Sequence, residues 1–254
     1  MDLSACIEWQ YAEAGEALAD RIRAASDSGL HYAEFHLWRD KDLKSIESAL
    51  AETGVVLTGI CVDPRRSIVD PAERDEFLAA VQETIEMAKP LGSPPLIIAS
   101  GFRVEGMSEQ AHFDNAVTSL RAAADMAEEA EITLVLEPLN TELFAAMYLV
   151  STSLGLDLIE AVGSPRLKLL YDAYHSRVMS ENMREVLTGR MHLVEHVQVA
   201  GYPGRNEPGT GDFDCAEVVQ ILRDLDYTGR IGLEYFPTRP SEASVADARK
   251  ALGL

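Results

Sequence analysis

The sequence lacks the features that mark extracellular and membrane proteins. Its three cysteines, Cys6, Cys61 and Cys215, are widely spaced, odd in number and form no CxxC pair. They predict no disulfide framework, which is typical of a reducing cytoplasm. No apolar run approaches the roughly 18 residues of a membrane helix, and the first residues lack the basic and apolar regions of a secretory signal. We therefore expect a cytoplasmic protein that does not bind membranes.

Positive charge is also scarce. The chain has 22 Lys and Arg residues against 42 Asp and Glu residues, which gives a formal net charge of -20. Such a surface repels phosphate backbones and argues against nucleic-acid binding. An anionic small molecule would need local compensation from a metal ion or an arginine. The sequence therefore favours a small-molecule partner, and it is compatible with a monomer and with a homodimer.

Glycine-rich phosphate loops are missing too. The chain contains neither GxGxxG nor a Walker motif, and its first apolar run leads instead into WQYAEAG (9–15). A doubly wound dinucleotide-binding fold usually carries such a loop after an early strand. This absence counts against the main alternative to a closed barrel.

What the sequence does contain is an alternation of short apolar runs with amphipathic stretches. The candidate strands are 3–9, 31–38, 55–62, 95–100, 132–137, 167–172, 192–199 and 230–235. The candidate helices are 13–27, 40–53, 71–91, 108–130, 151–162, 177–188, 215–225 and 241–252. Eight such units indicate a parallel sheet closed by βαβ connections, and 254 residues match the usual size of about 250. We predict a single (β/α)8 TIM barrel domain over residues 1–254.

Oxygen-bearing side chains stand at the ends of the last four candidate strands. They are Glu137, Asp172, Gln198 and Glu234, each about one strand-plus-helix unit from the next. The strand ends of such a barrel meet at one mouth, where three carboxylates would repel each other without a cation. Mg²⁺ and Mn²⁺ favour oxygen ligands. Neither Glu137 nor Asp172 stands at an obvious helix start, so we predict a divalent-metal site.

Four segments of the second half are distinctive. They are LEPLN (136–140), YDAYH (171–175), HVQVAGYPGRNEPGTGDFD (196–214) and IGLEYFP (231–237). Together they resemble the hydroxypyruvate isomerase family, which belongs to the xylose-isomerase-like barrel superfamily of sugar isomerases and epimerases. The stretch PGRNEPGTG is the most specific element. The first half agrees more loosely, through EFHLW (34–38) and the eightfold rhythm.

The resemblance implies a set of functional residues. Its metal ligands fall on Glu137, Asp172, Gln198 and Glu234. Its two proton-transferring carboxylates fall on Glu137 and Glu234, and its substrate contacts on His175 and Arg205. Gln198 is informative because the related ketose 3-epimerases usually place a histidine there. The implied cofactor is Mg²⁺ or Mn²⁺, with Zn²⁺ and Co²⁺ as alternatives.

The implied function is that of a metal-dependent isomerase acting on a small keto acid or ketose. Hydroxypyruvate would become tartronate semialdehyde through an enediolate, with proton transfer between the two glutamates. A ketose or keto-acid epimerase and a 2-oxo-tetronate-type isomerase are alternatives on the same site. Two further alternatives are a metal-dependent abasic-site endonuclease, since a related barrel does that work, and a non-catalytic sugar or keto-acid binding protein.

Two departures from the resemblance concern the substrate. Relatives are expected to carry a His-Asn-Leu-Pro type segment where this chain reads GICVDPRR (59–66), and often lysine where it has Phe236. Both positions are candidates for substrate contact, so the departures leave the identity of the substrate open. Trp9, Trp38 and Phe102 are candidates for an apolar wall over the cavity mouth.

Overall fold

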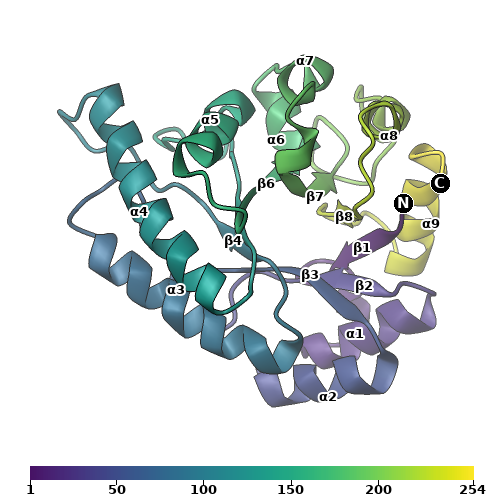
Figure 1. Ribbon diagram of the computed structural model, residues 1–254. Helices are drawn as coiled ribbons and strands as arrows, with labels where there is room; N and C mark the ends of the chain where they lie inside the picture. Colours follow the sequence, from purple (N-terminus) through teal and green to yellow (C-terminus); the bar gives the residue numbers. More distant parts are fainter.

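Eight parallel strands close into a barrel in the computed structural model, which describes residues 1–254 (Figure 1). The strands follow one another around the barrel in chain order, and β1 pairs with β8. Their bounds are β1 Leu3–Cys6, β2 Tyr32–Glu34, β3 Val56–Cys61, β4 Leu96–Ile98, β5 Leu134–Leu136, β6 Leu167–Asp172, β7 Val194–Val199 and β8 Ile231–Leu233. The predicted closed barrel is thereby confirmed.

Helices connect the strands and cover the outside of the barrel (Figure 1). They are α1 Leu18–Asp27, α2 Leu43–Thr53, α3 Arg74–Ala88, α4 Glu109–Glu129, α5 Thr152–Val162, α6 Ala173–Val178, α7 Met183–Leu187, α8 Cys215–Asp224 and α9 Ser241–Ala251. Three 3₁₀ turns accompany them: η1 Ala12–Ala14, η2 Lys89–Leu91 and η3 Met191–Leu193. None of the helices combines the length and the apolar character that crossing a bilayer requires.

Two of the differences between the structure and the sequence prediction lie beside the mouth of the barrel. The helix expected over 177–188 is two short helices, α6 and α7, because Ser180 adopts a left-handed backbone (φ 58) and Asn182 caps a new start. The first strand ends at Cys6 rather than Trp9, because the backbone N–H groups of Trp9 and Gln10 bond back to the Cys6 carbonyl, at 3.1 and 2.9 Å. This turn carries Trp9 over the mouth of the barrel.

The hydrophobic core lies in two places. Residues such as Leu96, Ile98 and Leu134 belong to the large cluster between the strands and the surrounding helices. The alternate residues of neighbouring strands point the other way, because side chains alternate along a strand. Four of them, Cys61, Ile97, Val135 and Leu170, form a separate small cluster inside the barrel. One half of the barrel interior, from β3 to β6, is therefore apolar.

The other half of the barrel interior is polar. Glu34 on β2 accepts a hydrogen bond from His196 on β7, at 2.6 Å between Oε2 and Nε2. Strands β1 and β8 separate β2 from β7 in the closed sheet, so this bond crosses the interior. Thr58 also donates to Glu34, at 3.2 Å, and bonds to Ser4 at 2.6 Å. These buried polar groups are paired with one another, as a low-dielectric interior requires, and they form a floor beneath the mouth.

Candidate active site

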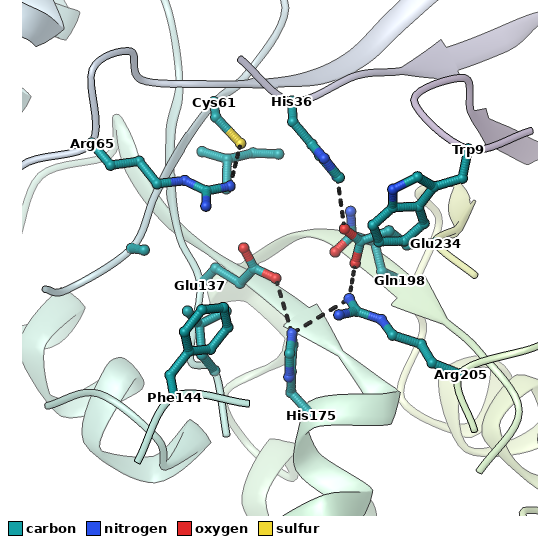
Figure 2. Close-up of a pocket in the computed structure, with 13 residues that line it drawn as sticks. Trp9, His36, Cys61, Arg65, Glu137, Phe144, His175, Gln198, Arg205 and Glu234 are labelled. Carbon is teal, nitrogen blue, oxygen red and sulfur yellow. Dashed lines mark hydrogen bonds and ion pairs between the residues drawn. The ribbon is translucent and has the colours of Figure 1, made fainter. Parts of the chain in front are cut away.

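A cavity of about 180 Å³ opens at the carboxyl ends of the strands (Figure 2). Five of the six site residues predicted from the sequence line it: Glu137, His175, Gln198, Arg205 and Glu234. The sixth, Asp172, lies beside it, 3.3 Å from His175 and 3.2 Å from Arg205. The structure thus brings all six together.

The strand register explains this convergence. Asp172 is the last residue of β6 and is the register partner of Gln198 on β7, which in turn is the partner of Gly232 on β8. Glu137 and Glu234 directly follow β5 and β8. Figure 2 shows the carboxylates of Glu137 and Glu234 entering the cavity from different walls. Neighbouring parallel strands therefore deliver their terminal oxygen atoms to one place.

Arg205 sits where two of these carboxylates meet. Its Nη2 atom donates to Asp172 Oδ2 at 3.2 Å and to Glu234 Oε2 at 2.5 Å. The guanidinium lies 5.3 Å from the ring centre of Trp9 and 5.1 Å from that of Tyr174. Such charge-assisted bonds and aromatic neighbours fix the orientation of a guanidinium. Arg205 therefore offsets part of the negative charge of the cavity.

Asp172 has a second role that the sequence did not reveal. Its Oδ1 atom accepts from the Tyr174 backbone N–H at 2.8 Å and caps α6. The expectation that Asp172 does not stand at a helix start was therefore wrong, because α6 begins directly at the strand end. The carboxylate nonetheless reaches the site, since its other oxygen faces Arg205 and His175.

His175 is held in one tautomer by Asn140. The Asn140 side-chain amide donates to His175 Nδ1 at 2.7 Å, and the Leu143 backbone N–H donates to the Asn140 carbonyl at 2.8 Å. Because Nδ1 accepts, Nε2 carries the proton and faces Asp172 and Glu137, at 3.3 and 3.7 Å. Burial, and then the charge of Arg205, lower the His175 pKa to about 3. His175 is thus a neutral hydrogen-bond donor.

The three carboxyl groups are in unlike environments. Burial, with repulsion from Glu234 and Asp172, raises the Glu137 pKa well above its usual range. Burial raises the Asp172 pKa to about 7 despite the opposing charge of Arg205. For Glu234, burial is outweighed by Arg205 and by the His36 hydrogen bond of 2.9 Å, which lower its pKa to about 2. Carboxyl pairs with pKa values driven apart are typical of acid–base sites.

Gln198 presents an unpaired oxygen to this site. Its amide nitrogen donates to Glu34 Oε1 at 2.8 Å, which fixes which end of the amide is which. Its Oε1 atom is buried and has no hydrogen-bond partner. A Cβ on Gly232 would lie 2.8 Å from Glu34 Oε1 and 2.8 Å from His196 Nε2, so only glycine fits this position without displacing the pair. The carboxyl groups belong to two candidate metal-ligand clusters, one of Glu137, Asp172 and His175 and the other of Cys6, His36 and Glu234, and the orphan Gln198 acceptor lines the same cavity.

Comparison with known proteins now gives the family. The family model described as xylose isomerase-like TIM barrel matches residues 22–253. The chain belongs to this family. It is 30% identical over 232 residues to hydroxypyruvate isomerase of Escherichia coli, covering 89% of this chain and 90% of that protein. The resemblance noted in the second half of the sequence is confirmed.

Two further relatives give the range of this xylose isomerase-like family. The chain is 23% identical over 244 residues to 2-oxo-tetronate isomerase of Cupriavidus necator, covering 93% of this chain and 94% of that protein. A crystal structure described as AP endonuclease, family 2, from Brucella melitensis has a TM-score of 0.89 at 25% identity and covers 96% of both chains. The two curated relatives described above are named as isomerases, and this chain is an enzyme of the isomerase and epimerase type.

The family segment GYPGRNEPGTG forms the loop that delivers Arg205. Arg205 itself has a left-handed backbone (φ 55). A Cβ on Gly211 would meet the Tyr202 carbonyl oxygen at 2.3 Å, so the loop folds tightly on itself. The buried Glu207 accepts from the Thr238 backbone N–H at 2.8 Å and from the Ser244 hydroxyl at 2.9 Å. These bonds tie the loop to the segment after β8 and hold Arg205 over the site.

The aromatic candidates divide in the structure. Trp9 lines the cavity and packs on Phe236, with ring centres 4.2 Å apart. Phe236 therefore extends an apolar wall where a lysine was expected in relatives. Trp38 instead donates to Thr84 on α3 at 3.1 Å, and Phe102 lines a neighbouring cavity. Of the three, only Trp9 faces the site.

Several site residues were missed by reading the sequence. Glu34, His36 and Arg65 were not singled out, although Glu34 ends a buried strand just as Asp172 does. The candidate strand over 31–38 ran past both Glu34 and His36, whereas β2 ends at Glu34, so reading the end of the candidate strand did not find them. Arg65 lies in the segment 59–66, which was a candidate for substrate contact as a whole, and the structure places Arg65 itself in the cavity.

Proposed function

We propose that this enzyme is a divalent-metal-dependent isomerase of small α-hydroxycarbonyl compounds, with hydroxypyruvate as the model substrate and tartronate semialdehyde as product. The observation that carries the proposal is the pair Glu137 and Glu234, which face one small cavity together with an unpaired Gln198 oxygen and the Asp172 carboxylate. The family membership and the curated isomerase relatives support the reaction type.

The residues of the site fit a hard divalent cation. Glu137, Asp172 and Glu234 would supply carboxylate oxygens and Gln198 its orphan amide oxygen, which is the donor set that Mg²⁺ and Mn²⁺ prefer. The pKa values of Glu137 and Asp172, raised by burial and by repulsion from neighbouring carboxylates, Glu234 above all, indicate a site in need of positive charge. A cation held there would supply Lewis-acid polarisation of the substrate carbonyl and positive charge for the developing enediolate.

The chain itself moves the protons. One of the two glutamates takes a proton from the hydroxymethyl carbon, and the other returns a proton to the neighbouring carbon that held the carbonyl. A proton also passes from the hydroxyl oxygen to the former keto oxygen, so that substrate and product are isomers. His175, neutral and held by Asn140, donates a hydrogen bond from Nε2 to a substrate oxygen. Trp9 and Phe236 exclude water from this side of the cavity.

Other substrates of the same chemistry would use the same residues. A ketose epimerase or a 2-oxo-tetronate-type isomerase needs the same two glutamates, and only the products distinguish them. An abasic-site endonuclease is disfavoured by the net charge of -20, because DNA binding depends on positive surface charge. The small volume of the cavity also favours a small-molecule substrate.

Hydrogen exchange in D₂O tests the proposal without assuming a product. The metal-loaded protein, with Mg²⁺ or Mn²⁺, is incubated with hydroxypyruvate, a 2-oxo-tetronate and several ketoses, and deuterium uptake is followed by NMR. We expect uptake next to the carbonyl of the true substrate and of its isomer, and none with chelated protein. Absence of exchange with every compound, with Mg²⁺, Mn²⁺, Zn²⁺ and Co²⁺ alike, would contradict the proposal.

A substitution beneath the site tests how Gln198 is oriented. Glu34→Gln removes the negative acceptor that holds the Gln198 amide nitrogen, so the amide can turn its nitrogen toward the cation. Loss of such an orienting partner typically lowers metal affinity about 10- to 100-fold. We expect that loss in calorimetric Mn²⁺ titrations. Ser4→Ala is the matched control, because Ser4 contacts Thr58 in the same polar floor. Equal affinity of Glu34→Gln and wild type would remove this role from Glu34.

A further inference from the structure

Arg65 is the one arginine in the active cavity that has no carboxylate partner. The only hydrogen bond of its side chain is a 3.8 Å approach of Nη2 to the Cys61 sulfur. Its neighbour Arg66 pairs with Glu76 at 2.6 Å, and Arg205 pairs with Asp172 and Glu234. A guanidinium keeps its charge at any physiological pH, so Arg65 brings to the cavity a positive charge that forms no direct ion pair.

The position of Arg65 sets it apart from the rest of the site. Arg65 comes from the loop after β3 and Arg205 from the loop after β7, and Figure 2 shows them on opposite sides of the cavity with Glu137 and His175 between them. A second cavity of about 480 Å³ shares Arg65, Leu139 and Phe144 as a common wall. The Arg65 side chain therefore lies at a boundary that a ligand can reach from the active cavity.

The contact with Cys61 does not use the charge of Arg65. Burial raises the Cys61 pKa to about 12, so the thiol is neutral. Cys61, Ile97 and Ala99 otherwise give this wall of the cavity an apolar lining. Arg65 itself is exposed where it lines the cavity, so its guanidinium is accessible to an anionic group that enters. A guanidinium forms strong charge-assisted hydrogen bonds with such a group.

We propose that Arg65 binds the carboxylate of the substrate and makes the enzyme selective for 2-oxo acids over uncharged ketoses. The proposal rests on the proposed isomerase function of the same site. A planar guanidinium matches a carboxylate with two parallel hydrogen bonds. With the substrate carboxylate at Arg65, its keto and hydroxymethyl groups extend toward Glu137, His175 and Glu234. This placement supplies the local positive charge that an anionic substrate needs near a chain of net charge -20.

Two substrates that differ only in the carboxylate test the proposal. Hydroxypyruvate carries it, and dihydroxyacetone has a hydroxymethyl group in its place. For Arg65→Met with Mn²⁺ we expect the KM for hydroxypyruvate to rise roughly 10- to 100-fold, the range for a lost hydrogen bond to a charged group, with kcat changed only a few-fold. In Arg65→Met, deuterium exchange into dihydroxyacetone should keep its wild-type rate. In Arg65→Lys, the KM for hydroxypyruvate should lie between the values of the wild type and of Arg65→Met.

Arg66→Met is the matched control, because Arg66 pairs with Glu76 outside the active cavity. Equal losses for both substrates in Arg65→Met would show a structural role, and unchanged kinetics would show that Arg65 does not touch the substrate. Either result overturns the proposal. Calorimetric binding of hydroxypyruvate distinguishes a failure of the Arg65 proposal from a failure of the proposed isomerase function. Weaker binding in Arg65→Met supports the carboxylate site even if the wild type turns over neither compound, whereas equal binding contradicts it.

Discussion

Glu137→Gln is expected to lower isomerase kcat at least about 10³-fold while the protein stays folded. Glutamine has the shape of glutamate but cannot exchange a proton near neutral pH, and a positioned acid–base group contributes roughly 10²- to 10⁴-fold to a reaction rate. Glu137 also stands to lose a bond to the cation. The same loss is expected of Glu234→Gln, since the Glu234 carboxylate accepts hydrogen bonds from His36 and Arg205. Turnover and circular dichroism of both variants check the prediction.

Deuterium exchange sharpens this experiment. If each glutamate serves one carbon, a variant that lacks only the second proton carrier should still exchange the hydroxymethyl hydrogens without forming product. The variant that retains exchange contains the residue that removes the first proton. Glu142→Gln is the control, because Glu142 is an exposed carboxylate on the segment after Glu137. Metal content is measured alongside, so that loss of the ion is not taken for loss of proton transfer. Near-normal turnover in both active-site variants would refute the shuttle.

Much of the site could be predicted because a parallel barrel turns sequence spacing into geometry. Carboxyl ends of neighbouring strands meet at one mouth, so Glu137, Asp172, Gln198 and Glu234 could be grouped without knowing any distance. The apolar strands that precede these residues are buried regardless of the conformation of the loops that follow. The closed barrel itself followed from the eightfold alternation, because short buried strands and amphipathic helices leave few other ways to cover a parallel sheet.

The rest of the site depends on contacts between segments that share no spacing rule. Glu34 orients Gln198 across the barrel, but the sequence pattern placed Glu34 inside a candidate strand over 31–38, whereas β2 ends at Glu34. Asn140 selects the His175 tautomer, yet in the sequence it is one polar residue in a loop. Arg65 reaches the cavity from an irregular segment. Asp172 both caps α6 and faces the site, which shows that a capping role and a functional role can coexist in one carboxylate.

Removal of divalent cations is expected to abolish turnover and to lower the melting temperature, with a larger loss at pH 8.5 than at pH 6.5. Without a cation, the Asp172 pKa of about 7 and the raised Glu137 pKa mean that the folded protein binds more protons than the unfolded chain. Stability then falls as pH rises through this range, since the carboxyls must ionise beside Glu234. His175 acts in the opposite sense, but its lowered pKa costs stability only below about pH 6.5, its ordinary value, outside the window.

Bound cation reverses the pH trend, because ligand carboxylates bind it in their ionised form and protons compete less as pH rises. At a free metal concentration of 100 times Kd, binding stabilises the fold by about 2.7 kcal/mol, or roughly 5–10 °C in melting temperature for a chain of this size. Asp172→Asn is the diagnostic variant, since its amide oxygen can still cap Tyr174 while the charge is gone. Its melting temperature should respond little to added Mn²⁺ and less to pH without it. If chelated wild-type protein keeps both its activity and its melting temperature, the four oxygen donors hold no ion. Removal of a catalytic cation would leave its ligand carboxylates to repel each other, and this repulsion would change both measurements.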